Sequence, residues 1–595
     1  MLSIIDVSRV EDCGWLVNNG NLIHPVLTVT CSKLIGRHQG VNKLKPPHKI
    51  FGDENAERDR LLKECWITHG YEAMHSPVLT GRWGTGKSAL LISRNRGLQY
   101  ELGKVDILRD RIWYITEQTL RIESLFQIKS KFDGDPGLLN AMFQDVWRAE
   151  INRIFCKILD MLYLYYRSPE GKHWKSVRRI AASEICHDTL WINISSISKL
   201  FLNGAKGEAV DSMIDGFQDL INRKTKENIL RCLMDIEGME GDLVVPSVSI
   251  EPIETPTSTL ETDASLSQLM ISALLNVFET EYAPDETRVY MQVSIGIPWH
   301  RFEATKLNLP QKIIENRASI EWSKEKLQKF IAERIKWEFR RVRRHVSEKD
   351  SVSIWYSLFD KYVRNDHCDG EVNESSFEYI LRHTHWRARD LLHFCRQCVL
   401  SEAERQGVDP DNVISGHRGL RVTGRTISDT LKSQGAEVSK IRNTEIQRRF
   451  GGHGDIMQAL RGINVPFSTD DFFGRFRRYR NNAQYGALSE GNRVLKILWE
   501  AGVVGLQVVA LTEEAYRNLE TKYPVSHCKR LTGDTKTYKI GAAYFYSYNS
   551  DVDFTEMIDR YDADMDLRTE ANLIVHPLFF EALDCHVSTD HPLGV

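Results

Sequence analysis

The sequence predicts an α/β fold with a parallel sheet, followed by a helical region and a further C-terminal domain. Strand-like and helical segments alternate between residues 76 and 297, which favours parallel strands joined by helices. A glycine-rich loop, GRWGTGKS, stands between the first of these strands and the helix after it. The chain has 595 residues, which is too long for one compact core and indicates several domains.

The expected elements of the sheet follow one another in a regular order. A helical pattern comes first, and then apolar strands alternate with helices whose apolar residues recur at three-and-four spacing. The strands are expected at residues 76–80, 105–116, 243–250 and 288–297, and the helices at 51–75, 137–235 and 266–282.

The second half of the chain is expected to be helical at first and mixed later. Residues 320–345 and 353–405 are strongly helical, and helices to about residue 503 precede two β-like segments. The predicted organisation is an N-terminal extension (1–50), an α/β core with a helical insertion at about 120–235 (51–310), a helical lid (311–405), a Gly/Ser/Arg-rich linker (406–440) and a C-terminal domain (441–595).

Composition excludes several classes of protein. Hydrophobic residues make up 42% and charged residues 27%, as in ordinary globular chains, which argues against general disorder. The 78 basic and 81 acidic side chains give a net charge of −3, which excludes a polybasic nucleic-acid coat but not local basic patches. Eleven scattered cysteines do not form a disulfide framework. With no signal peptide and no membrane helix expected, we predict a cytoplasmic protein without a membrane partner.

The loop from Gly81 to Ser88 fits the pattern G-x-x-x-x-G-K-[ST] between a strand and a helix. In this pattern Gly81, Gly84, Thr85 and Gly86 bring backbone N–H groups around a phosphate, and the N-terminus of the following helix adds its positive end. Lys87 supplies a charge between the β- and γ-phosphates, and the Ser88 hydroxyl binds Mg²⁺. The alternative is a structural glycine turn with a stray lysine. The motif predicts a site for ATP and Mg²⁺.

A nucleotide-hydrolysing loop of this kind also needs an acid at the end of a neighbouring strand. Glu251 follows the β-rich segment PSVSI, where the chain turns into a Pro/Thr-rich loop. The rival is CLMDIEG, with Asp235 and Glu237, but its helical spacing favours a solvated helix end. We therefore expect Glu251 to hold Mg²⁺ together with Ser88 or to position the attacking water.

These segments resemble a family. FGDENAERD, GRWGTGKSAL, VSIEPIE and VSIGIPWHRF are similar to bacterial P-loop ATPases of the AAA+/STAND superclass, of the kind found in mobile and anti-phage defence loci. IEWSKEKLQKFIAERI and HWRARDLLHFCRQCVLSEAERQG resemble boxes of the helical lid of that group. The resemblance covers about residues 50–405. VLKILWEAGVVGLQ and YKIGAAYFYSY are similar to the winged-helix-type domain that such ATPases share with archaeal replication initiators.

The resemblance implies roles for four further residues. Phe51 and Gly52 would border the adenine, and Ser294 would be a polar sensor of the γ-phosphate or water. Arg389 would be the lid arginine that contacts the γ-phosphate. The chain departs from the family at two positions, because Glu251 replaces the usual Asp or Asp-Glu and Ser294 replaces the common Asn. Both departures predict that hydrolysis is slow or absent.

Two clusters of basic residues admit alternative interpretations. One cluster either provides an arginine finger to a neighbouring subunit or forms a solvated helix face. It consists of Arg334, Arg340, Arg341, Arg343 and Arg344. The other either contacts a nucleic acid or belongs to an amphipathic helix that docks on its own core. It consists of Arg475, Arg477, Arg478 and Arg480, interleaved with Phe472, Phe473, Phe476 and Tyr479. The pair Cys395 and Cys398 suggests zinc, but it lies in an apolar helix where thiols pack as small hydrophobes.

Taken together, these patterns predict a Mg²⁺- and ATP-dependent ATPase that acts as a conformational switch or motor, with a role in anti-phage defence implied by the resemblance. A homo-oligomer and a separate effector protein are the expected partners. The C-terminal domain would bind either duplex DNA or a partner protein. Two alternatives remain. One is a nucleotide-dependent scaffold with little turnover, and the other is a replication or transposition accessory that loads onto DNA.

Overall fold

A computed structural model describes most of the chain between residues 49 and 587. The described residues are 49–53, 59, 61, 65, 78–81, 84–92, 113–116, 136–166, 171–183, 208–240, 246–253, 264–305, 311–315, 317–320, 322–345, 350–364, 373–450, 456–481, 491–510, 512, 514, 529–530, 541–546 and 569–587. They fall into two compact units, each with its own hydrophobic core. The first unit holds Asp59, Leu61 and 78–320, and the second holds 49–53, Cys65 and 322–587.

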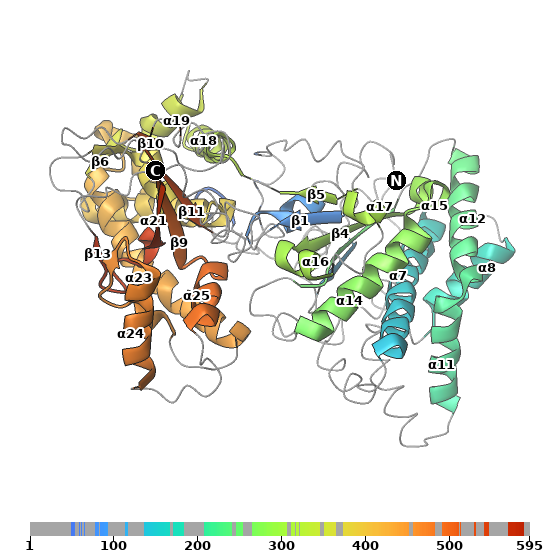
Figure 1. Ribbon diagram of the computed structural model, residues 1–595. Coiled ribbons are helices and arrows are strands. Elements are labelled where there is room, and N and C mark those ends of the chain that lie inside the picture. Colours follow the sequence, from blue (N-terminus) through green and yellow to red (C-terminus); the bar gives the residue numbers. More distant parts are fainter. Residues whose placement is uncertain are drawn as a thin grey trace. The chain divides into compact units, whose positions relative to one another are not determined.

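A parallel sheet forms the centre of the first unit (Figure 1). Its five strands are paired in the order β2-β3-β4-β1-β5, and every pairing is parallel. β1 and β3 are buried along their whole length, as strands covered on both faces are. The strands are β1 (Val78–Gly81), β2 (Trp113–Thr116), β3 (Ser247–Glu251), β4 (Gln292–Pro298) and β5 (Arg317–Ser319). The expected α/β class with a parallel sheet is confirmed.

Helices join these strands and pack beside them. Between β2 and β3 lie α7 (Pro136–Tyr166), α8 (Lys172–Ala181), α11 (Glu208–Ile221) and α12 (Arg223–Glu240), so the predicted insertion is helical where it is described. β4 follows α14 (Ala264–Val277), the π-helix η1 (Phe278–Tyr282) and α15 (Asp285–Tyr290), and precedes α16 (Trp299–Thr305) and α17 (Gln311–Glu315). α7 and α14 lie side by side, and the Trp147 indole N–H donates to the Met270 carbonyl at 3.0 Å (Figure 1).

The second unit begins with helices, as the sequence predicts. Ser323 caps α18 (Lys324–Arg341), because its hydroxyl accepts from the Lys326 N–H at 3.2 Å. The following elements are α19 (Ser351–Leu358), the hairpin β6 (Tyr362–Arg364) and β7 (Asn373–Ser375), α20 (Ser376–Arg382), α21 (Ala388–Gln406), α22 (Pro410–Ser415), η3 (His417–Gly419) and α23 (Gly424–Phe450).

The C-terminal part of this unit contains an antiparallel sheet of order β10-β11-β9-β12. Its elements are η4 (Ile456–Leu460), β8 (Asn464–Val465), α24 (Thr469–Asn481), α25 (Gly491–Glu500), β9 (Val504–Ala510), β10 (Lys529–Arg530), β11 (Gly541–Tyr546), β12 (Thr569–Val575), η6 (Pro577–Phe579) and β13 (His586–Val587). A winged-helix arrangement of this part stays a prediction.

The prediction of a linker at residues 406–440 is wrong. This segment holds α22 and more than half of α23, and Ile427 and Leu431 are buried in the core of the second unit. Polar side chains also fill buried positions on α23, where the Ser428 hydroxyl lies 3.2 Å from the Tyr379 hydroxyl and the Thr430 hydroxyl bonds to the Cys398 thiol. Small hydroxyl side chains at core positions hide the apolar periodicity that would have predicted this helix.

The helical part of the second unit and its C-terminal sheet share one core, so no domain boundary falls at residue 441. The His385 ring stacks on the His576 ring with centroids 4.5 Å apart. His385 Nε2 donates to the Gly502 carbonyl at 3.2 Å, and His576 Nε2 donates to the Thr384 carbonyl at 3.1 Å. Burial, and then the neighbouring His385, lower the pKa of His576 well below its usual value. The neutral ring is therefore the form that suits this core.

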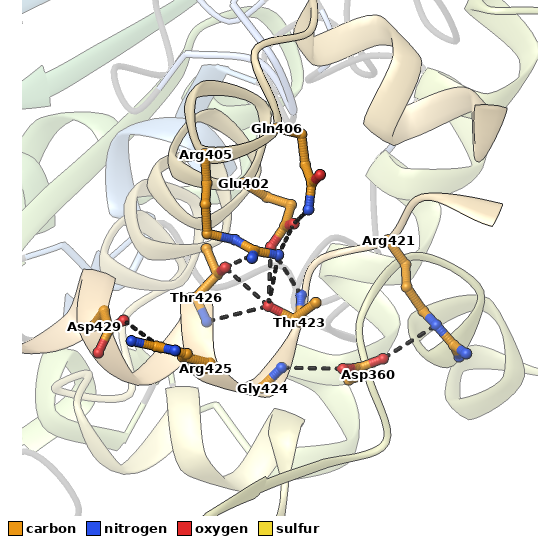
Figure 2. Close-up of polar contacts among 10 residues, drawn as sticks. All are labelled: Asp360, Glu402, Arg405, Gln406, Arg421, Thr423, Gly424, Arg425, Thr426 and Asp429. Carbon is orange, nitrogen blue, oxygen red and sulfur yellow. Dashed lines mark hydrogen bonds and ion pairs between the residues drawn. The ribbon is translucent and has the colours of Figure 1, made fainter. Parts of the chain in front are cut away.

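Glu402 anchors the start of α23 (Figure 2). Its buried carboxylate accepts from the Thr423 hydroxyl at 3.0 Å, the Thr423 N–H at 3.2 Å and the Gln406 amide at 2.9 Å, and also from the side chains of Thr426 and Arg405. Burial alone would raise the pKa of Glu402. The hydrogen bonds outweigh it and lower this pKa to about 2.

The Glu402→Gln variant is therefore expected to lose about 2–3 kcal/mol of unfolding free energy at pH 7. A carboxyl whose pKa is lowered by folding stabilises the fold above its unfolded pKa, and this stabilisation is lost as the pH falls toward about 2. The difference between wild type and variant in chemical denaturation should thus shrink by more than half between pH 7 and pH 3. The control is Glu404→Gln, at an exposed neighbouring residue. It should change neither the unfolding free energy at pH 7 nor the dependence of this free energy on pH.

Among the described helices, none combines the length and the apolar character that crossing a membrane requires.

Candidate functional site

The loop after β1 has the backbone that the motif requires. Gly84 and Gly86 have φ angles of 78° and 98°, which favour glycine. A Cβ on Gly81 would lie 2.7 Å from the Thr85 hydroxyl oxygen, so a side chain there would collide with the loop. Helical bonding starts at once, because the Leu90 N–H donates to the Gly86 carbonyl at 2.9 Å. The described part of the loop is thus a tight turn that runs directly into a helix N-terminus.

Lys87 lies across this turn. Its side chain is buried, and its Nζ donates to the Gly81 carbonyl at 3.2 Å. The ammonium group is therefore held beside the loop backbone, at the N-terminal end of the helix that begins there. A fixed positive charge next to backbone N–H groups and a helix N-terminus is an arrangement that binds phosphate.

Glu251 meets this loop from a strand that does not touch β1. It ends β3, and β4 lies between β3 and β1 in the sheet. The Ser88 hydroxyl donates to Glu251 Oε2 at 2.6 Å, although the two residues are 163 positions apart. Gly296 of β4 adjoins both residues' elements, because a Cβ there would lie 3.0 Å from a Leu91 methyl group of the helix after the loop and in ordinary contact, 3.7 Å, with Glu251 Cγ.

The order of the strands explains why the loop and the acid meet. The connection that leaves β1 leads to β2 at one edge of the sheet, and the connection that leaves its neighbour β4 leads to β5 at the other edge. Ligands of open α/β sheets bind at such a switch point, outside the carboxyl ends of the strands. Gly81 and Glu251 each stand at the carboxyl end of their strand.

The residues at this switch point fit a Mg²⁺ ion and a nucleotide phosphate. A hydroxyl and a carboxylate in contact are the oxygen ligands that Mg²⁺ takes, usually in small numbers and together with phosphate oxygens. The turn, Lys87 and the helix N-terminus supply the complementary donors and positive charge for phosphate.

Ser294 lies away from this edge. It pairs with Ser249 in the register of β3 and β4, two residues before Gly296, which adjoins Glu251. At about 3.3 Å per residue it stands roughly 7 Å below the level of the acid, and it is buried. β4 continues to Pro298, so the sensor position implied by the resemblance is misplaced at Ser294.

The rival acids lie on a helix. Asp235 and Glu237 belong to α12, where Asp235 is exposed and Glu237 accepts from the Tyr290 hydroxyl at 2.8 Å. Neither stands at the end of a strand, so the structure favours Glu251 over this pair.

Phe51 and Gly52 belong to the second unit and are buried there. The Phe51 N–H donates to Glu338 at 2.8 Å, and its carbonyl accepts from Arg334 at 2.6 Å. Arg396 donates to the carbonyls on either side, at Ile50 (3.0 Å) and Gly52. The backbone N–H and carbonyl of Phe51 are thus engaged within the second unit, and a contact of Phe51 and Gly52 with adenine stays a prediction.

The other basic candidates divide into anchored and exposed side chains. Arg341 pairs with Glu338 and Asp411, so it belongs to the internal contacts of the second unit, as do Arg334 and Arg344. Arg389, the second residue of α21, is exposed, and no described residue pairs with it. The role of Arg389 at a γ-phosphate stays a prediction.

The aromatic residues of α24 pack inward. Phe472 and Phe476 are buried and stack on each other, with ring centroids 6.0 Å apart, whereas Arg477 and Arg478 are exposed. This helix is therefore an amphipathic element of the core of its own unit. The side chains of Tyr479 and Arg480 lie outside the described residues.

The paired cysteines of α21 also serve the core. Cys395 and Cys398 are buried, and burial raises the pKa of both thiols, that of Cys398 to about 12. A thiol that resists deprotonation is a poor metal ligand. Throughout the described ranges, no group of three His, Cys, Asp or Glu side chains could hold a metal ion.

The chain matches no model of a protein family, and a search of curated proteins finds no match.

Proposed function

We propose that this chain is an ATPase that binds ATP and Mg²⁺ at the loop Gly81–Ser88. The observation that carries the proposal is the contact of 2.6 Å between the Ser88 hydroxyl and Glu251. It supports a pairing of a phosphate-binding loop with an acid on a separate strand, which nucleotide hydrolysis needs. A structural glycine turn would give no reason for a carboxylate to meet the first turn of the following helix.

Each residue would have a distinct task. Lys87 and the loop N–H groups bind and orient the phosphates, and Lys87 stabilises the negative charge that develops on them. The Ser88 hydroxyl and the Glu251 carboxylate hold Mg²⁺, which neutralises phosphate charge when bound. Glu251 also orients the attacking water and accepts its proton. A single acid with both tasks is consistent with slow turnover.

In the cell, we propose that ATP drives a conformational switch or motor in a homo-oligomer that works with a separate effector protein. The resemblance to defence-locus ATPases supports a role against phage. The direct test measures phosphate release from ATP with Mg²⁺, together with the particle mass with and without nucleotide. Phosphate release and a particle mass that changes with nucleotide would support the proposal. A chain that neither binds nor hydrolyses ATP would refute it.

A scaffold with little turnover is the second candidate. It is favoured by the single acid at the end of β3, where the resembled family carries Asp or Asp-Glu. This candidate predicts assembly with ATP but hardly any phosphate release. A DNA-loading accessory instead predicts that DNA stimulates turnover, so the same assay with and without duplex separates the candidates.

In the Arg389→Ala variant, the difference between the binding free energies of ATP and ADP is expected to shrink by about 1–3 kcal/mol. A lid arginine bonded to the γ-phosphate stabilises only the bound triphosphate. Calorimetric titration with both nucleotides measures this difference. The exposed Arg425 on α23 of the same unit, which pairs with Asp429, gives a matched control in Arg425→Ala. Equal losses for ATP and ADP would contradict the assignment of Arg389.

A further inference from the structure

Two arginines of the second unit adopt a backbone conformation that normally belongs to glycine. Arg343 has a φ angle of 57° and Arg418 has a φ angle of 53°, and both side chains are exposed. Left-handed conformations are unfavourable for residues with a Cβ, and they occur often at functional sites. Neither residue pairs with a described acid, so neither arginine is explained by the internal contacts of the fold.

The end of α18 shows why glycine would suit position 343. The Arg344 N–H donates to the Phe339 carbonyl at 2.8 Å, and the Arg343 N–H donates to the Arg340 carbonyl at 3.1 Å. This is the Schellman motif, whose left-handed residue is usually glycine. Glycine would adopt this left-handed conformation more easily than arginine does. The arginine instead places a guanidinium group in solvent.

Arg344 fastens this helix end to the turn that carries Arg418. Its guanidinium donates to the Ile414 carbonyl at 2.8 Å and to the Ser357 carbonyl at 2.7 Å. A Cβ on Gly416 would lie 3.1 Å from the guanidinium carbon of Arg344, so the turn rests directly on it. The helix end that carries Arg343 and the turn that carries Arg418 are therefore packed together and form one surface.

The same surface continues to the hairpin of β6 and β7. Arg421, which follows the turn, pairs with Asp360 at 3.1 Å, and Asp360 also accepts from the Gly424 N–H (Figure 2). Lys361 and Tyr362, which follow Asp360, are exposed, and the Lys361 ammonium lies 5.1 Å from the centre of the Tyr362 ring, which is 53% exposed. We define the basic surface by its exposed members: Arg340, Arg343, Lys361, Tyr362, Arg364 and Arg418.

Two described acids beside the basic surface are already neutralised. Asp411 pairs with Arg341, and Asp360 pairs with Arg421. Within the described residues, no carboxylate forms an ion pair with Arg340, Arg364 or either left-handed arginine. A chain with a net charge of −3 thus carries on this surface several cations that form no ion pair with a described acid, together with one exposed aromatic ring.

We propose that the basic surface binds single-stranded nucleic acid. Arginine and lysine side chains neutralise backbone phosphates, and an exposed aromatic ring stacks on an unpaired base. Acidic protein segments would meet the same charges, but they have no bases to stack on Tyr362. This proposal is independent of the proposed ATPase activity, because all six residues lie in the second unit and none belongs to the phosphate loop.

The test measures fluorescence anisotropy of a labelled single-stranded oligothymidylate with the full chain, without nucleotide and over a range of salt. The Arg343→Gly/Arg418→Gly variant removes both side chains at positions where glycine fits the backbone, so its melting temperature should equal or exceed that of wild type. Its affinity at low salt should fall at least tenfold. The slope of the logarithm of the binding constant against the logarithm of the salt concentration should become shallower by about 1.4. Each phosphate contact to a single strand contributes about 0.7 to this slope, and the variant loses two contacts.

The matched control is Lys440→Ala/Arg461→Ala, which removes two exposed cations of the same unit that lie outside the basic surface. It should bind the oligonucleotide like wild type. Failure of the wild-type chain to bind at low salt would overturn the proposal, as would unchanged binding by the glycine variant. An equal loss in the control, or equally tight binding of a polyglutamate peptide by wild type, would also overturn it.

Discussion

Replacement of Lys87 by alanine is expected to abolish tight ATP binding. The ammonium group is buried beside the loop, where it donates to the Gly81 carbonyl. Hydrogen bonds to charged groups contribute about 1.5–3 kcal/mol each, and this lysine would serve two phosphates, so we expect the affinity to fall about 100-fold or more. Calorimetric titration of wild type and variant with ATP and Mg²⁺ measures the change.

The control for this experiment is Lys172→Ala, which removes an exposed lysine of the same unit at the start of α8. It makes the same change in net charge, and it should bind ATP like wild type. Thermal melting shows whether Lys87→Ala keeps its fold. A folded Lys87→Ala variant with undiminished affinity would end the assignment of this loop to a nucleotide.

The loop was predictable because its signal is local. Strand, glycines, Lys87 and Ser88 follow one another within a few residues, and each has a backbone or chemical reason to be there. Glu251 was predictable as an acid at the end of a strand. Its contact with Ser88 was not predictable, because nothing in a separation of 163 residues indicates that only β4 stands between the two strands.

The second unit was less predictable because polar side chains carry its internal contacts. Glu402 and the hydroxyl-bearing residues of α23 occupy buried positions, and the sequence pattern therefore indicated a linker. Arg334 and Glu338 hold the backbone of Phe51, which lies more than 280 positions away, so the arginines of α18 resembled a solvated face. Buried polar pairs require partners that only the folded chain specifies.

Replacement of Glu251 by glutamine is expected to separate ATP binding from ATP hydrolysis. Glutamine keeps the size of the side chain and an oxygen that accepts from the Ser88 hydroxyl, so the loop should still bind nucleotide. It has no negative charge with which to accept a proton from water. We therefore expect phosphate release to fall by a factor of about 100 or more, while the ATP affinity measured by calorimetry stays within a few-fold of wild type.

The matched control for this variant is Asp235→Asn, which makes the same change of charge on the exposed side of α12. It should hydrolyse ATP at the wild-type rate, because Asp235 lies on a helix and not at the carboxyl edge of the sheet. The reverse result, with Asp235→Asn inactive and Glu251→Gln active, would move the catalytic acid to α12. Equal activity of both variants and wild type would show that neither acid positions the water, and the contact between Ser88 and Glu251 would then serve only the fold or the binding of Mg²⁺.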